Sequence, residues 1–449
     1  MKRQQYRGKF EFVFALVLGA ASACTATSGT STGNPMENNG GGPGTPEGAK
    51  FLKSELVRES PALDASDSAA LGAGNRAFAF DLYRKLAGDS SKNLFFSPFS
   101  ISVALAMTYP GANGQTEAEL GSTLHFDLPE SALHPAFNAT LRALDGRAQE
   151  LSPALVDEVT GTGFQLSIVN QAWGQQGYPF LSSYLDVLAK NYGAGLFSVQ
   201  FADSENTRQR INGWVADQTQ DRVQNLLPVG SLTSDTRFVL TNAIYFKGSW
   251  LVKFDPDDTT DGVFHAPAAD RGVRMMHNGL DARFAEGPGY RALELPYLSP
   301  AVRMLLILPD GGTLQTFAAD FQPEKFQEIL QDLSQHEVKL SLPKFTFESE
   351  NPLKGPLTAL GMVDPFTSSA DFSDIAGGVE ELFIDEVYHK AFVAVDEVGT
   401  EAAAATAVVG STVSVKPQAE ITFDRPFLFA IYDAPTGQIL FLGNVVDPR

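Results

Sequence analysis

Apolar residues recur at helical spacing early in the folded part of the chain and at strand spacing later. The first helical pattern covers residues 67–86. Ser97 and Pro98 predict the start of another helix, because serine can cap the free N–H groups of a first turn and proline suits its first position. Further helical patterns lie at residues 115–124, 131–149, 181–191 and 205–220.

The strand patterns are concentrated in the second half. They lie at residues 93–96, 164–173, 238–247, 304–308, 338–342, 382–395, 427–432 and 439–446. Residues 433–437 are turn formers and predict a hairpin between the last two strands. Because helices cluster early and strands late, and no second linker or repeat interrupts them, we expect one α+β domain over residues 65–449.

The N-terminus has the pattern of an export signal. A basic start is followed by an apolar run at residues 12–21 and by the small residues 21–23. The run is too short to span a membrane and ends in a small-residue exit, which favours a signal peptide over residues 1–23.

Cys24 follows this signal directly and is the only cysteine, so an intramolecular disulfide is excluded. The arrangement resembles a bacterial lipoprotein signal, in which the cysteine is lipidated. The alternative is a stray thiol just beyond an ordinary cleavage site. Residues 24–60 are rich in Gly, Ser, Thr, Asn and Pro and predict a flexible tether. We therefore expect an extracytoplasmic protein, secreted or lipid-anchored at the cell surface, that meets a membrane only through this anchor.

Composition narrows the possible partners. The chain has 449 residues, of which 43% are hydrophobic, and this is enough for a large core. The formal net charge of -20 disfavours nucleic acid as a partner, because an acidic surface repels phosphate.

The sequence offers no recognisable catalytic or metal-binding motif. Nucleophile-elbow, zinc-protease and dinucleotide-binding signatures are absent from it, and its six histidines show no metal-ligand spacing. We therefore predict that the protein is not an enzyme and has no metal or other cofactor.

The most informative segment is residues 394–406, which read Ala-Val-Asp-Glu-Val-Gly-Thr-Glu-Ala-Ala-Ala-Ala-Thr. This run resembles the hinge of the serpin family, where a central strand passes into the reactive-centre loop. Six other segments resemble that family in the same order: residues 93–101, 241–250, 293–297, 370–373, 387–391 and 424–429. The resemblance covers roughly residues 65–449.

The resemblance implies a serpin fold, with about nine helices around three β-sheets and an exposed reactive-centre loop. It also implies a monomer that traps serine endopeptidases as a suicide substrate: the cleaved loop inserts into the main sheet with the protease still acyl-linked. The residues implied are the hinge residues Glu397, Gly399, Thr400, Glu401, Ala402, Ala403, Ala404, Ala405 and Thr406, the buried polar "shutter" residues Ser97, Ser100, Asn242 and His389, and the "breach" residue Trp250.

The loop residues can be tested against the demand that they become a buried strand. Side chains alternate between faces along a strand, and the charged Glu401 must face water. The positions that then face the core are all small or β-branched: Thr400, Ala402, Ala404, Thr406, Val408, Gly410 and Thr412. From Ala402 to Val415 the chain has no charge and no proline, as an inserting strand requires.

Family spacing places the cleaved bond between Val413 and Ser414, with Thr412–Val413 as the alternative. A valine before the bond favours elastase-like or subtilisin-like proteases, and cysteine proteases remain a further target class. Heparin binding is not expected, because the segment at 131–149 mixes basic and acidic residues. The competing function is a non-inhibitory serpin acting as a carrier, chaperone or storage protein; the small, uncharged hinge argues against it.

Overall fold

The structure is a computed structural model that describes residues 44–62, 64–88, 91–147, 150, 164–311, 314–378, 382–400 and 416–449. The described residues contain ten α-helices: α1 (Ala65–Leu86), α2 (Pro98–Ala106), α3 (Gly114–Leu124), α4 (Glu130–Arg147), α5 (Ser182–Val187), α6 (Ser204–Gln218), α7 (Leu314–Asp320), α8 (Pro323–Asp332), α9 (Lys354–Thr358) and α10 (Ser373–Ala376). A π-helical turn, Leu188–Tyr192, extends α5. The α+β class predicted from the sequence is confirmed.

The strands in chain order are β1 (Lys50–Leu52), β2 (Leu94–Phe96), β3 (Phe164–Gln175), β4 (Leu196–Val199), β5 (Phe238–Ser249), β6 (Thr260–His265), β7 (Asp270–Gly287), β8 (Tyr290–Pro296), β9 (Val302–Pro309), β10 (Ser334–Pro343), β11 (Phe345–Pro352), β12 (Val387–Val395), β13 (Gly399–Thr400), β14 (Gln418–Thr422), β15 (Phe427–Asp433) and β16 (Gln438–Val445). The strand expected from residue 382 thus begins later, at Val387, while the hairpin between β15 and β16 is confirmed.

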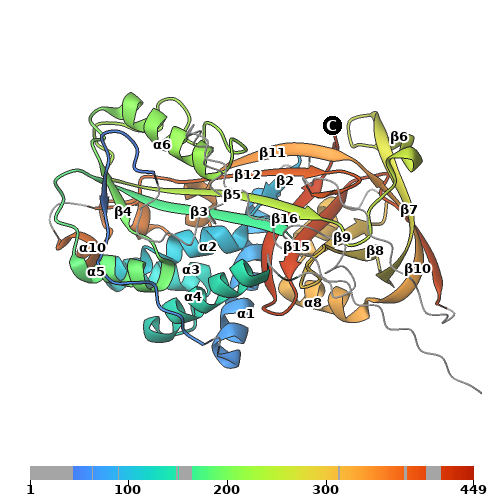
Figure 1. Ribbon diagram of the computed structural model, residues 1–449, viewed down its shortest axis with the longest axis horizontal. Coiled ribbons are helices and arrows are strands. Elements are labelled where there is room, and N and C mark those ends of the chain that lie inside the picture. Colours follow the sequence, from blue (N-terminus) through green and yellow to red (C-terminus); the bar gives the residue numbers. More distant parts are fainter. Residues whose placement is uncertain are drawn as a thin grey trace, which may run out of the picture.

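A seven-stranded sheet forms one layer of the molecule, in the order β1-β4-β3-β5-β13-β12-β11. In Figure 1, α6 lies above this sheet and α1 to α4 lie below it. Because both faces are covered, a central strand must be apolar on both sides, and β5 is buried almost along its whole length. Ser97 caps α2 and Pro98 occupies its first turn, as predicted.

The second sheet differs from the expectation of two further, separate sheets. The described residues form one nine-stranded sheet along the path β14-β10-β7-β8-β9-β15-β16-β2, with β6 beside β7. The long strand β7 explains the difference. Its residues 270–275 pair with β6, its residues 283–287 pair with β8, and β10 pairs with the residues between, 275–284. It therefore joins the two expected sheets into one.

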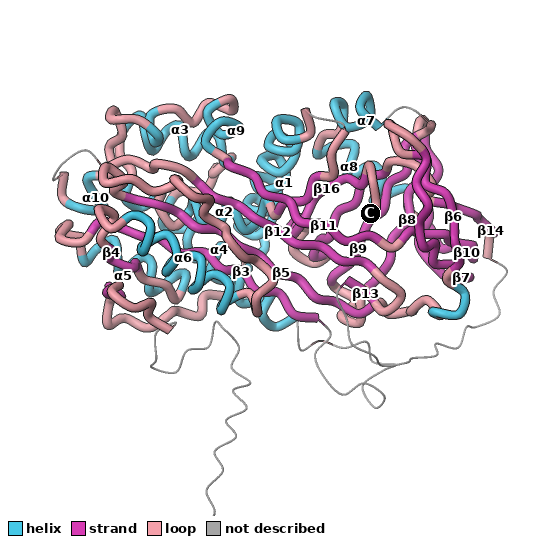
Figure 2. The backbone as a smooth tube through the Cα atoms, turned by 90° about the horizontal axis from the view of Figure 1, so that it is seen from above, coloured by secondary structure: helices cyan, strands magenta, loops and turns pink. Residues whose placement is uncertain are grey.

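The last residues of the expected tether, from Lys50 onward, belong to the folded body. Residues 50–52 form β1, which pairs with β4 at the edge of the seven-stranded sheet, and the Phe51 ring packs 4.9 Å from that of Phe197. The chain then crosses to α4, where the Arg58 guanidinium donates a hydrogen bond of 2.8 Å to Asn138. Figure 2 shows the seven-stranded sheet from above, with α6 crossing it. Residues 50–60 are thus part of the folded body.

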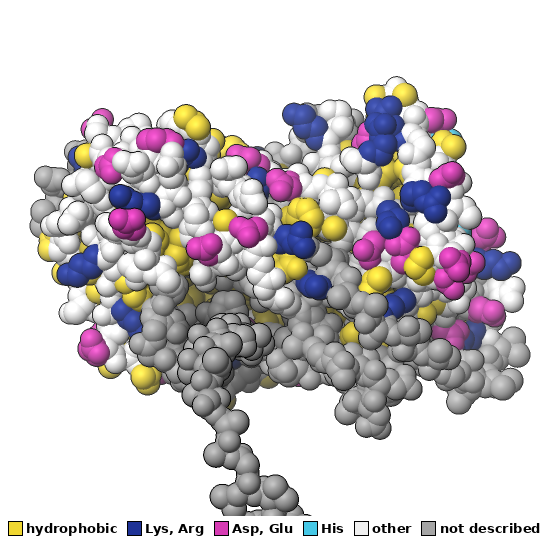
Figure 3. Space-filling model, turned by 45° about the horizontal axis from the view of Figure 1, so that its top comes forward, with side chains coloured by type: hydrophobic (Ala, Val, Ile, Leu, Met, Phe, Trp, Pro, Cys, Tyr) yellow, Lys and Arg dark blue, Asp and Glu magenta, His cyan; other side chains and the backbone are white. Residues whose placement is uncertain are grey.

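The surface carries charges of both signs. On the face drawn in Figure 3, acidic and basic side chains alternate, and neither sign gathers into one large patch. Within the described ranges, no helix combines the length and apolar character needed to cross a membrane.

Candidate functional site

The seven-stranded sheet is parted at one end between β5 and β12. These strands pair directly only from Leu240–Val387 to Ile244–Ala391. At the other end, the two residues of β13 lie between them: Thr400 pairs with Gly248 of β5 and with Val395 of β12. Between these two regions, residues 245–247 and 392–394 have no partner across the gap among the described residues. The start of the predicted loop thus lies between β5 and β12 at the end of the sheet where these two strands do not pair with each other.

A tight turn at residues 396–399 directs the chain into this space. The Asp396 carboxylate accepts hydrogen bonds from the backbone N–H groups of Val398 and Gly399, at 2.9 and 3.2 Å. The Asp396 N–H donates back to the Gly399 carbonyl at 2.9 Å. The aspartate side chain therefore reverses the chain direction without a helix or a long loop.

Glu397 fastens the turn to the second sheet. Its carboxylate accepts hydrogen bonds from the Lys344 ammonium at 2.7 Å and from the Thr259 hydroxyl at 2.8 Å. Burial alone would raise the pKa of Glu397, but these hydrogen bonds outweigh burial and hold its pKa below the ordinary value. The side chain is therefore a charged anchor of the hinge.

Trp250 and Tyr297 hold the same turn from the core side. Trp250 donates from its backbone N–H to the Val398 carbonyl at 2.9 Å and from its indole Nε1 to the Asp396 carbonyl at 3.0 Å. Its ring stacks on that of Tyr297, with centroids 4.8 Å apart. The Tyr297 hydroxyl is 2.8 Å from that of Thr400, which is only 1% exposed. The predicted core-facing position of Thr400 agrees with this burial.

Ser97, Ser100, Asn242 and His389 meet in one buried cluster, which we call the shutter cluster. The Ser97 N–H donates to His389 Nε2 at 3.1 Å, so the ring proton resides on Nδ1. That proton is donated to Asn242 Oδ1 at 2.5 Å, and the Asn242 amide donates to Ser100 Oγ at 2.7 Å. The cluster joins α2 to the two strands that pair below the gap.

Sequence reasoning missed one member of this cluster. Asn170 of β3 accepts a hydrogen bond from the Asn242 amide and donates to the Ser100 carbonyl at 3.1 Å. Asn170, Asn242 and His389 lie opposite one another on β3, β5 and β12. A polar residue within an apolar strand pattern was the available signal. The cluster therefore ties three neighbouring strands where the sheet is closed.

His389 is a neutral structural group in this environment. Complete burial lowers its pKa from 6.5 to about 3. Its Nδ1 bonds the Asn242 amide oxygen, and its Nε2 accepts from the Ser97 N–H, so a second ring proton on Nε2 would lose this hydrogen bond. Its hydrogen bonds join β12 to β5 and to the start of α2, which is a structural role and not that of a general base.

The far end of the loop is anchored on the second sheet. The Lys416 ammonium lies 2.5 Å from the Asp281 carboxylate, and the Pro417 carbonyl accepts from the Glu337 N–H at 2.9 Å. The chain then continues as β14, parallel to β10. The hinge residues 401–406, the predicted bond Val413–Ser414 and Cys24 lie outside the described residues. In the described part of the chain, no group of three His, Cys, Asp or Glu side chains could hold a metal ion.

A substitution at Gly399 tests how closely β13 packs against β5. A Cβ on Gly399 would lie 2.0 Å from the Gly248 carbonyl oxygen and 2.7 Å from Ser249 Cα. Gly399→Ala should therefore displace β13 and lower the free energy of unfolding by about 1–3 kcal/mol, measured by urea denaturation. Gly272→Ala in β7 is the matched control, because its Cβ would meet nothing within 4 Å. Equal stability of the two variants would contradict this packing.

His389 tests the electrostatics of the shutter cluster. Its pKa is about 3 when folded and near 6.5 when unfolded, so the unfolded state binds more protons between these values. Stability should fall as the pH drops from about 6.5 towards 3, by up to about 1.4 kcal/mol per pH unit for this group. Urea denaturation of wild type and His389→Gln across that range should show a shallower slope for the variant. Parallel slopes would show that His389 is not buried as a neutral ring.

Comparison with known proteins identifies the family to which the chain belongs. Residues 73–448 match the family model described as serpin (serine protease inhibitor). An uncharacterized serpin-like protein of Thermococcus kodakarensis is 36% identical, with 96% of this chain and 95% of that protein covered. The human leukocyte elastase inhibitor is 38% identical, with coverage of 84% and 99%.

Solved structures agree with these relatives. The native state of the thermophilic serpin tengpin has a TM-score of 0.76 at 25% identity and covers 89% of this chain and 99% of that one. Uncleaved ovalbumin has a TM-score of 0.74 at 30% identity, with coverage of 84% and 100%. The expected fold is confirmed, and the chain belongs to the serpin family of serine protease inhibitors.

Proposed function

We propose that this protein inhibits serine endopeptidases by inserting its cleaved reactive loop between β5 and β12. The observation that carries the proposal is the parted sheet, with Gly399 and Thr400 already seated at its mouth. In this mechanism the protein is consumed with its target and does not act as an enzyme.

The register of β13 predicts where each inserted residue would lie. Thr400 is opposite Gly248 and Val395, and an antiparallel strand moves one residue back along both neighbours for each residue forward. Ala402 would then lie between Phe246 and Val393 on the core face. A small side chain is required there, because both neighbours are buried.

The same register brings Thr406 to the shutter cluster. Thr406 would lie between Asn242 and His389, whose side chains now bond to each other at 2.5 Å. Insertion must break that bond, and the threonine hydroxyl can replace it because it donates and accepts. On the outer face, Glu401 would lie beside Lys247, so its charge would be balanced. Each residue type matches its predicted surroundings.

The energetic driving force is new strand pairing. About a dozen net backbone hydrogen bonds at roughly 1 kcal/mol each would contribute on the order of 10 kcal/mol. Native proteins are stable by only about 5–15 kcal/mol, so this gain is comparable to the whole stability of a domain. The uncleaved form is therefore proposed to be metastable.

The proposed targets are proteases that cleave after small aliphatic residues, at Val413–Ser414. The similarity to leukocyte elastase inhibitors of several vertebrates supports an elastase-like target. Subtilisin-like and cysteine proteases are further targets to be tested. The proposed place of action is outside the cytoplasm, with the protein released or held by a lipid on Cys24; the basic and apolar N-terminal pattern supports this.

The direct test is to mix the purified protein from residue 44 onward with pancreatic elastase. A denaturing gel should show a band at the summed mass, because the acyl bond survives denaturation. Mass spectrometry should find a released C-terminal peptide that begins at Ser414.

The two failures of this test have different meanings. Complete cleavage without a complex would contradict inhibition of this protease and would favour the non-inhibitory alternative. A complex whose peptide begins at another residue would keep the mechanism and move the cleaved bond.

A further inference from the structure

The N-terminal segment joins the folded body at one end of the seven-stranded sheet. Residues 44–49 form a turn, in which the Ala49 N–H donates a hydrogen bond of 3.0 Å to the Pro46 carbonyl. The turn lies against α6, because a Cβ on Gly48 would be only 3.1 Å from the guanidinium of Arg210. We call this turn the tether root and this end of the sheet the tether pole.

Strand register gives the position of the tether root along the sheet. Lys50 of β1 lies opposite Ser198 of β4, and Ser198 lies opposite Gly174 of β3. Gly174 in turn lies opposite Phe238, the first residue of β5. The hinge enters at the other end of β5, a 12-residue strand that spans about 40 Å. The tether root and the hinge therefore lie at opposite ends of the same sheet.

Both attachment points of the reactive loop lie at the end away from the tether root, which we call the loop pole. The two residues of β13 enter beside the end of β5, and the Lys416 ammonium pairs with Asp281 of β7. In Figures 1 and 2, β4 lies towards the left end of the molecule, and in Figure 2 β14 lies at the right end. The tether and the uncleaved loop thus leave the body in different directions.

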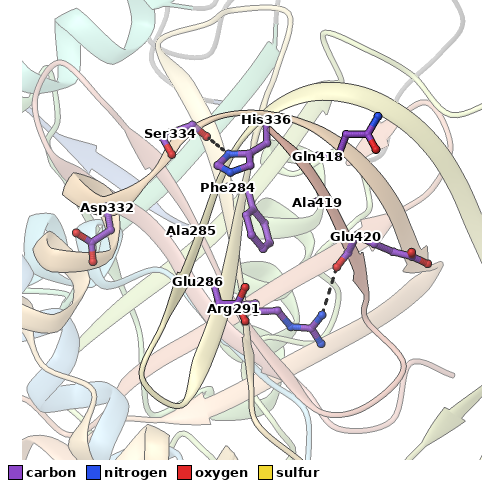
Figure 4. A pocket seen from close by; sticks show the side chains of 10 residues that line it. All are labelled: Phe284, Ala285, Glu286, Arg291, Asp332, Ser334, His336, Gln418, Ala419 and Glu420. Atoms are coloured by element: carbon purple, nitrogen blue, oxygen red, sulfur yellow. Dashed lines mark hydrogen bonds between the residues drawn. The ribbon is translucent and has the colours of Figure 1, made fainter. Parts of the chain in front are cut away.

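The loop pole also carries a pocket of about 600 Å³ beside β14 (Figure 4). Arg291 lies opposite Glu286, and Lys339 lies opposite Glu420, so the charges around the pocket balance. The pocket therefore selects neither sign of charge. The two poles differ in which segments of the chain leave them.

Insertion of the loop would carry its cleaved end to the tether pole. The register of β13 places Gly410 opposite Phe238, and Val413 lies three residues beyond, about 10 Å further along. The strands β5, β3 and β4 separate the inserted strand from β1, and four steps of about 4.8 Å give about 19 Å across the sheet. Val413 would therefore come to rest about 20 Å from Lys50.

A protease linked to Val413 would reach the tether root from this position. A domain of about 200 residues has a radius of gyration of about 16 Å, so it is about 40 Å across. Before cleavage, the same protease would meet the loop at the loop pole, about the length of β5 away. Trapping thus changes which end of the inhibitor the protease lies against.

We propose that trapping brings the protease against the root of the N-terminal tether. This inference rests on the proposed inhibitory function. A molecule held by its N-terminus would then offer its uncleaved loop on the side that faces away from the holding surface. After cleavage, it would draw the protease to the pole that faces this surface. The position of the tether would thus give the capture a direction, from the surroundings towards the surface.

The test measures energy transfer from one dye on the inhibitor to acceptor dyes on pancreatic elastase. Two single-cysteine proteins are prepared from the chain that begins at residue 24 and carries Cys24→Ser. Glu47→Cys places the dye at the tether root, and Asp257→Cys places it beside the hinge as the matched control. Both positions are exposed acidic residues, and Asp257 lies in the short helix Pro256–Asp258 that follows the contact of Phe254 with Glu397.

Each labelled protein is mixed with two forms of elastase. The active protease forms the covalent complex, which a denaturing gel verifies. Elastase whose catalytic serine is replaced by alanine can form only the encounter complex at the uncleaved loop. The comparison therefore separates the position of the protease before and after trapping.

With the dye at position 47, transfer should be at least about five-fold higher in the covalent complex than in the encounter complex, because the protease moves towards the dye by about the length of β5. With the dye at position 257, the encounter complex should give the higher transfer. The melting temperatures of both labelled proteins should match that of the Cys24→Ser parent, because both side chains are exposed.

A covalent complex without a rise in transfer from position 47 would overturn this inference and leave inhibition standing. Equal ratios for the two dye positions would overturn it as well. If active elastase forms no covalent complex, the proposed inhibitory function fails, and this inference fails with it.

Discussion

The structure depends on an incompletely paired sheet. Strands β5 and β12 are hydrogen-bonded over one short stretch, and beyond it they are separated by a gap in which, of the residues that the structure describes, only the two of β13 pair with both strands. Backbone groups along such a gap are paired less well than in a continuous sheet, so a further strand would be stabilising. Helices and the second sheet cover the two faces of this sheet, so the molecule stays folded although β5 and β12 are only partly paired.

Two polar assemblies hold the sheet in this state from opposite ends. At the open end, Asp396, Glu397 and Trp250 fix the turn that starts the loop, so the chain enters the gap in one defined direction. At the closed end, the shutter cluster joins β5 and β12 through Asn242 and His389. In the proposed mechanism, the first assembly would guide insertion of the loop, and the second would resist it. A sequence that serves both states must therefore place small residues in the loop and satisfied polar groups in the sheet.

Helices α1 to α6 and eight of the sixteen described strands could be predicted from periodicity, whereas the short helices α7 to α10 were not. The meeting of Ser97, Asn242 and His389 could be predicted from the family resemblance. Asn170 and Tyr297 could not, since their roles depend on strand register and on ring stacking between distant segments. The range predicted for the flexible tether, residues 24–60, was too long. Lys50–Leu52 form a strand by pairing with the edge strand β4, which is distant in the sequence. The sheet count was wrong, because nothing in a strand pattern shows that β7 has different partners along its two halves.

The central claim is that a strand can be added to this sheet, and heat tests it most directly. The loop would be cut at a single site by a protease that is not trapped, and the melting temperatures of intact and cut protein would be compared. A gain on the order of 10 kcal/mol predicts that cleavage raises the melting temperature by at least about 10 °C. An unchanged or lowered melting temperature after complete cleavage would contradict insertion and with it the account of the parted sheet.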